Sequence, residues 1–222
     1  MAIRTWTPPV MMALGARLTV LSPTGERSVA LEDFFTGYYE TVLGKNELIA
    51  EAHIPAQGAR RAAYMKVTTG SADDWPALGV AVAIEADGKA IKSARVVVSA
   101  ATSMAMRLKS AEAALAGKTA DDKTLAQAGD AAAEEADFIA DVRGSVPYKR
   151  ELLRRSSRRM LLRRGESGPP CGTPLDVWFS LPSTTTPARR YLPISLRMPL
   201  SLTLRATRFI KVSWSTPKAF GA

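Results

Sequence analysis

The alternation of apolar and polar residues predicts a hairpin near the start of the chain. Residues 17–21 alternate, Pro23-Thr24-Gly25 supplies a turn, and residues 27–31 can return as the partner strand. Before this hairpin we expect a short helix from Pro8-Pro9 to Gly15, because proline suits a first helical turn and glycine suits a helix end. A short aromatic-rich segment, residues 32–39, follows the hairpin.

Further alternation predicts a half-buried strand at residues 47–54, closed by loop residues 55–58. Three more strands are expected after it, with Asp87-Gly88 as the turn between the last two. They are residues 63–68, 78–86 and 95–101. Together these three form a small antiparallel sheet.

The spacing of apolar residues changes to a helical one from Arg107. Leu108, Ala111, Ala114 and Leu115 recur at helical spacing, and a glycine at position 117 ends the segment. Alanine-rich residues 121–136 and residues 146–155 predict two further helices. A sheet followed by helices predicts an α+β fold, with a three-stranded antiparallel sheet packed on a helix bundle.

The last part of the chain differs in composition and charge. The formal net charge is +9, and residues 156–222 contribute 11 Lys and Arg against two acidic residues, so the whole excess lies there. Eight of the fourteen prolines are in the same segment. Residues 200–214 alternate weakly, but no coherent core pattern emerges, and we expect an irregular basic tail.

The remaining composition excludes several classes of site. One cysteine, Cys171, allows no internal disulfide and cannot supply the thiolates of an iron–sulfur cluster. His53, the one histidine, is expected on a strand surface rather than at a metal site. No apolar run approaches the length of a membrane helix, and no secretory signal is present, so we expect a cytoplasmic protein without a transmembrane segment.

Four segments in a fixed order carry a family resemblance. They are PPVMMALGARLTVLSPTGER, LEDFFTGYYETVLGKNELIAEAHIP, AYMKVTTGSADDWPALGVAVAI and ADFIADVRGSVPYKRELLRR. Over residues 8–155 the chain resembles the later part of the FAD-binding medium subunit of molybdenum hydroxylases. This family includes the medium subunits of aerobic carbon monoxide dehydrogenases and the flavin subunits of xanthine dehydrogenases.

The resemblance implies three parts of the chain. Residues 1–57 would be the C-terminal remnant of the central FAD-binding lobe. Residues 58–158 would be the C-terminal domain of the flavin subunit, and residues 159–222 the irregular tail. Because family members have two glycine-rich, phosphate-binding loops and this chain has no glycine pair, we expect it to hold FAD weakly or not at all by itself.

The resemblance also implies a cofactor, partners and a reaction class. In this family FAD lies on this subunit, whereas a molybdopterin-binding large subunit and an iron–sulfur small subunit carry the other redox centres. Electrons pass from molybdenum through the clusters to the flavin, which hands them to a quinone or NAD. The chain is therefore expected to be an incomplete oxidoreductase subunit that relays electrons, with no catalytic residue of its own for the hydroxylation.

The resemblance implies two residues near the flavin and a third beside them. Lys66 and Asp74 occupy matching positions, and Tyr64 is an adjacent aromatic residue that could pack along the ring. A lysine stabilises negative charge on the ring or the pyrophosphate, and a carboxylate accepts hydrogen bonds from ribityl hydroxyls or anchors the lysine. The alternative is that Lys66 is a solvated strand residue and Asp73-Asp74 a turn. Gly70 stands where the family has an arginine.

Three other interpretations stay open at this level. The tail could be an out-of-frame extension, since arginine, proline and serine with little alanine is what a shifted reading of a GC-rich gene yields. The chain could be a subunit-docking module without a cofactor. It could also bind nucleic acid through the basic tail, although no nucleic-acid-binding motif supports this and we regard nucleic acid as an unlikely partner.

Overall fold

The structure is a computed structural model, and it describes residues 7–68, 75–88, 90–165, 178–179 and 211–214. Gly70, Asp74 and Cys171 lie outside the described residues. The same holds for most of the tail, so the frame-shift hypothesis and the nucleic-acid hypothesis are not addressed by the structure.

The first unit is a hairpin-based sheet with one helix. Its elements are α1 (Thr7–Ala13), β1 (Arg17–Ser22), β2 (Gly25–Ala30), η1 (Leu31–Asp33), β3 (Phe35–Gly37), β4 (Glu40–Thr41) and β5 (Leu48–Ile54). β1 pairs antiparallel with β2 and with β5, and β11 (Lys211–Trp214) adds in parallel to β5. The hairpin and the α1 helix confirm the predictions from the sequence, and His53 is exposed on β5 as expected.

The second unit contains a five-stranded sheet in the order β10-β6-β7-β8-β9. Its strands are β6 (Arg61–Val67), β7 (Leu78–Asp87), β8 (Ala90–Ser99), β9 (Met106–Arg107) and β10 (Trp178–Phe179). The three antiparallel strands β6, β7 and β8 are those predicted, whereas β9 and the parallel strand β10 were not expected. Two-residue strands carry no alternation, which is why the sequence pattern missed both.

Three helices follow this sheet: α2 (Lys109–Leu115), α3 (Asp122–Glu135) and α4 (Val146–Gly165). The Asp121 carboxylate accepts a hydrogen bond from Thr124 N at 2.7 Å and caps α3. Glu135 accepts hydrogen bonds from the first backbone N–H groups of α2, those of Lys109 and Ser110, at 2.9 and 2.8 Å. These acidic residues therefore have capping roles. α4 runs ten residues further than predicted, because Met160 and Leu161 continue its buried face.

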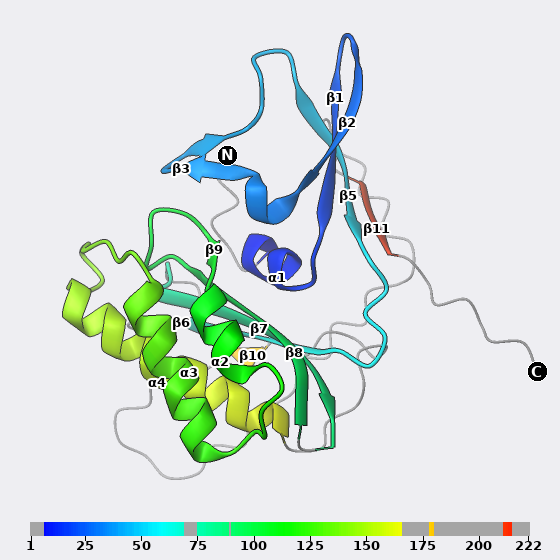
Figure 1. Cartoon of the computed structure of the whole chain (residues 1–222). Helices are drawn as coiled ribbons and strands as arrows, with labels where there is room; N and C mark the ends of the chain where they lie inside the picture. The colour runs from blue at the N-terminus through cyan, green and yellow to red at the C-terminus, as the bar shows by residue number, and fades with distance from the viewer. Residues whose placement is uncertain (1–6, 69–74, 89, 166–177, 180–210, 215–222) are drawn as a thin grey trace, which may run out of the picture.

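The sheet of the second unit is covered on both faces (Figure 1). On one face Val80, Val82 and Ile84 of β7 join the core formed with α2, α3 and α4. On the other face Ala81 and Ala83 join the core formed with α1 and the first unit. Burial on both sides explains why β7 is a nearly continuous apolar run, and the mixed helix and sheet content confirms the α+β class.

Within the described ranges, no helix has the length and apolar character needed to cross a membrane. The same part of the chain contains no group of three or more histidine, cysteine or acidic side chains placed to hold a metal ion.

Candidate functional site

The face of the second sheet that is turned toward α1 carries two of the three predicted site residues. Strand register places Lys66, Gly79 and Ser99 in one row across β6, β7 and β8. Tyr64 lies in the next row, opposite Ala81. Because side chains two residues apart on a strand share a face, Lys66 and Tyr64 both lie on the side of the first unit.

Tyr64 is buried in the core between the sheet and α1, with 4% of its surface exposed. Burial raises the pKa of its hydroxyl to about 12, and a hydrogen bond with Ser99 offsets part of this rise. Gly79 makes the arrangement possible, because a Cβ at that position would lie 2.7 Å from Tyr64 Oη and 2.5 Å from Ser99 Oγ. Tyr64 therefore anchors this face of the sheet, and its contact with a flavin stays a prediction.

Lys66 lies partly exposed near the end of β6, where the β6–β7 connection leaves the sheet. Ala77 N donates to Val67 O at 2.9 Å, so the connection opens directly after Lys66 and Val67. Asp74 belongs to that connection but lies outside the described residues, and its proximity to Lys66 stays a prediction. An ammonium group and the hydroxyls of Tyr64 and Ser99 thus form the polar groups at this end of the sheet.

A charged cluster joins the two units. Arg107 on β9 is hydrogen-bonded to Glu32 of η1, and it pairs with Glu112 of α2 through Nη2 at 2.6 Å and Nε at 3.1 Å. Glu112 also accepts a hydrogen bond from Val96 N at 3.0 Å. The hydrogen bond with Glu112, reinforced by that with Glu32, raises the pKa of Arg107 against the opposing effect of burial. The hydrogen bond from Arg107 likewise lowers the pKa of Glu32.

The motif around Asp141 forms a tight, supported turn. Asp141 and Gly144 exchange backbone hydrogen bonds. The ring of Tyr148 packs against Gly144 so closely that a Cβ on Gly144 would lie 2.4 Å from Tyr148 Cδ1. The fully buried Lys149 donates to Ile139 O at 2.9 Å and pairs with Asp141 at 2.9 Å. The Arg143 guanidinium lies 5.9 Å from the ring centroid of Trp75. Trp75 lies in the β6–β7 connection, three residues before β7 begins at Leu78.

The Asp141–Lys149 pair gives a prediction for stability against pH. Burial alone would raise the pKa of Asp141, but hydrogen bonds from Lys149 and Arg143 N outweigh it and hold that pKa below its usual range. The stabilisation is therefore present above the unfolded pKa of about 3.9 and is lost as pH falls through the folded pKa. We expect Asp141→Asn to lower the free energy of unfolding at pH 7 by about 1.5 kcal/mol.

The measurement is a series of urea unfolding curves between neutral and acidic pH. The difference between Asp141→Asn and wild type should shrink as Asp141 becomes protonated. Asp137→Asn, at an exposed position four residues away, is the matched control and should follow wild type throughout. A difference that is constant with pH would contradict the assignment to this carboxylate.

Neither the Arg107 cluster nor buried Lys149 was found from the sequence. Glu32 lies 75 residues from Arg107 in the chain, so no local spacing signals the pair. Lys149 falls within a predicted helix, but a lysine in such a pattern is ordinarily solvated. Asp141, Gly144 and Tyr148 lie in a segment that carries the family resemblance, but nothing in that segment signals the Asp141–Lys149 pair.

Two family models match the two units in chain order. Residues 6–57 match the FAD binding domain in molybdopterin dehydrogenase, and residues 62–164 match the CO dehydrogenase flavoprotein C-terminal domain. Their order defines the class: the later part of a flavoprotein subunit of the molybdopterin dehydrogenase type.

Individual relatives agree with this class. The carbon monoxide dehydrogenase medium chain of Hydrogenophaga pseudoflava is 30% identical over 69% of this chain and 54% of its own length. The nicotine 6-hydroxylase medium subunit of Paenarthrobacter nicotinovorans is 28% identical over 71% and 55%. Among solved structures, carbon monoxide dehydrogenase from Hydrogenophaga pseudoflava superimposes with a TM-score of 0.65 at 31% identity, covering 68% of this chain and 53% of the other.

The chain therefore belongs to the family of FAD-binding medium subunits of molybdenum hydroxylases, as the resemblance predicted. It spans about half the length of the curated relatives it matches.

Proposed function

We propose that this chain forms the later part of a flavin subunit that relays electrons from iron–sulfur clusters of a partner subunit through FAD to a quinone or NAD. The observation that carries the proposal is the match of both units, in order, to the two family domains. A molybdopterin-binding large subunit and an iron–sulfur small subunit are the partners this assignment implies. FAD, when bound, supplies the redox chemistry that no side chain can.

The polar groups beside Lys66 fit one edge of a flavin site. An ammonium group suits carbonyl or phosphate oxygens as ligands, and the Ser99 hydroxyl lies in the same row of the sheet as Lys66. The described residues thus supply a wall, and the glycine-rich loops of the family would supply the phosphate-binding part.

In this proposal each of the three predicted site residues has a defined role. Lys66 places a positive charge at the flavin or its pyrophosphate, and Asp74 orients Lys66 or accepts hydrogen bonds from ribityl hydroxyls. Tyr64, held in the core, keeps β6 at a fixed distance from α1, so the ammonium group of Lys66 starts from a rigid strand.

The test joins this chain to the preceding half of the Hydrogenophaga pseudoflava medium chain and measures FAD binding by flavin fluorescence. We expect the chimera to bind FAD and Lys66→Met to weaken binding about tenfold, because a charge-assisted hydrogen bond is lost. Arg61→Met, on the same strand, is the matched control and should bind like the parent.

Two results would count against the proposal. Equal affinities of the Lys66→Met and Arg61→Met chimeras would remove Lys66 from the site while leaving the flavin function intact. A folded chimera that holds no FAD would contradict the flavin function itself and favour a docking module without cofactor.

A further inference from the structure

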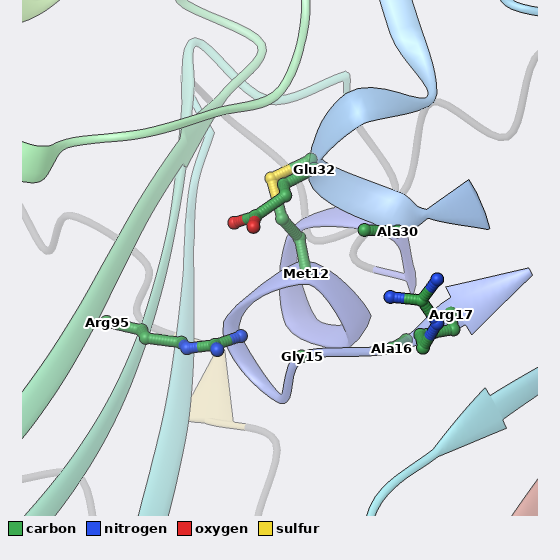
Figure 2. A pocket seen from close by; sticks show the side chains of 7 residues that line it. All are labelled: Met12, Gly15, Ala16, Arg17, Ala30, Glu32 and Arg95. Atoms are coloured by element: carbon green, nitrogen blue, oxygen red, sulfur yellow. The ribbon is translucent and has the colours of Figure 1, made fainter.

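The joint between the two units contains a small cavity that neither Lys66 nor Tyr64 lines. It lies between the end of α1, the start of β1, η1 and β8, and has a volume of about 130 Å³ (Figure 2). Arg95 enters from β8, Arg17 from β1 and Glu32 from η1. On this face of the sheet the Tyr64 row lies between the row of Lys66 and the row of Arg95. Along β8, Arg95 is four residues from Ser99, the β8 residue in the row of Lys66.

Arg95 is a half-buried cation without a protein acceptor. Among the residues that the structure describes, its guanidinium makes no hydrogen bond and no ion pair. Burial is the main cause that lowers the pKa of Arg95, and the nearby positive charges of Arg107 and Arg60 lower it further, against a smaller opposing effect of the Glu32 and Glu112 carboxylates. Since an arginine stays protonated in proteins, its N–H donors face the cavity with a positive charge that nothing compensates fully.

The backbone is shaped to admit this guanidinium. Gly15 follows α1 with a φ of 74°, and a Cβ on Gly15 would lie 2.6 Å from Arg95 Nη1. Any larger residue would displace Arg95 from the cavity. The proximity of the α1 C-terminus favours a cation there, but its carbonyl groups are already engaged, with Gly15 N bonded to Met12 O and Ala16 N to Met11 O.

The other charges leave a positive site. The Glu32 carboxylate is committed to Arg107, which also holds Glu112. Arg17 donates from Nε to Ser28 Oγ at 3.0 Å and from Nη2 to Ser28 O at 3.5 Å, which leaves the N–H groups of Nη1 for a ligand. Two arginine forks on opposite walls of one cavity are a typical arrangement for binding an oxyanion.

We infer that this cavity binds a small inorganic oxyanion of the phosphate class, held between Arg95 and Arg17. The volume accommodates such an ion but not a nucleoside, which distinguishes it from a nucleotide site. Bound there, the ion bridges β8 of the second unit and β1 of the first, and it stabilises their packing. This inference does not rest on the proposed flavin function.

The test measures the affinity of the full chain for inorganic phosphate by calorimetry, with sodium chloride adjusted to constant ionic strength. We expect phosphate to bind and to raise the melting temperature, because the folded state alone contains the site. Arg95→Met should weaken binding about tenfold or more. Lys92→Met removes an exposed cation of the same strand that pairs with Asp87 and does not line the cavity, and it should bind phosphate like wild type.

A second variant separates the site from general charge effects. Ala30→Leu fills the cavity without altering charge and should abolish phosphate binding while the fold is retained. Adenosine monophosphate should bind far more weakly than phosphate. The inference is overturned if wild type does not bind phosphate, if Arg95→Met binds as tightly as Lys92→Met, or if the nucleotide binds as well as the free ion.

Discussion

Replacing Arg107 by methionine is expected to lower the free energy of unfolding by about 3 kcal/mol. The Arg107 and Glu112 side chains are only 19% and 11% exposed, so the substitution leaves a largely buried carboxylate with Val96 N as its remaining described donor. Breaking a buried pair by removing one partner costs about 3–5 kcal/mol, and we take the lower end because Glu32 is 36% exposed. Urea unfolding of the full chain measures the loss.

The control for Arg107→Met is Arg155→Met. Arg155 pairs with Glu151 on the exposed face of α4, where ion pairs contribute little to stability. We expect this variant to unfold close to wild type. If Arg107→Met were no more destabilised than the control, the cluster would not connect the two units energetically.

The second large effect is expected for Gly129→Val in α3. An ideal Cβ at Gly129 would lie 2.9 Å from the backbone oxygen of Arg154, so any side chain there pushes α3 away from α4. Because this contact covers Leu125 and Leu153 in the core, we expect a loss of about 2–3 kcal/mol. Gly129→Ala should lose less, since alanine favours the helix by about 1 kcal/mol over glycine.

Thermal and urea unfolding of Gly129→Val and Gly129→Ala measure these losses. A control variant separates the steric clash with α4 from the effect of valine on helix propensity. Gln127→Val introduces the same side chain at an exposed position of the same helix and is the matched control. Its cost should stay near that of ordinary helix propensity, about 0.5 kcal/mol. Equal losses for Gly129→Val and Gln127→Val would show that the helix contact tolerates a side chain.

The Lys66 region and the Arg95 region of the sheet have different proposed roles. Lys66 and the opening of the β6–β7 connection lie at one end of the sheet, whereas Arg95 and the small cavity lie further along the same face. The face that α1 covers therefore carries two polar regions separated by the buried Tyr64 row. In the proposed functions one region contacts a flavin and the other binds an ion that fastens the units together.

The flavin-related residues could be predicted only because a family resemblance assigned them. In the sequence Lys66 is a lysine in a strand, and its neighbours along the chain do not distinguish it from a solvated residue. Tyr64 shows the limit of such an assignment: its position was suggested by the resemblance, but its burial against α1 follows from strand register and from the absence of a side chain at Gly79.

The sequence by itself determined the class of fold and most of the elements. Alternation marked β1, β2 and β5, a nearly continuous apolar run marked β7, and the proline and glycine around α1 marked its ends, because these signals depend on residues a few positions apart. β8 begins five residues earlier than predicted, since the apolar positions Ile91 and Ala94 are separated by polar residues that weaken the pattern.

Only the tertiary structure decided which charges meet. Arg107 reaches Glu32 across 75 residues, Lys149 is enclosed beneath the Asp141 turn, and Arg95 lies over Gly15. Each contact depends on how the sheet, α1 and the helices pack, and packing is set by the sum of many buried apolar surfaces rather than by any local run of residues. The joint between the units, and the ion site proposed in it, are therefore properties of the folded chain that no segment of the sequence contains.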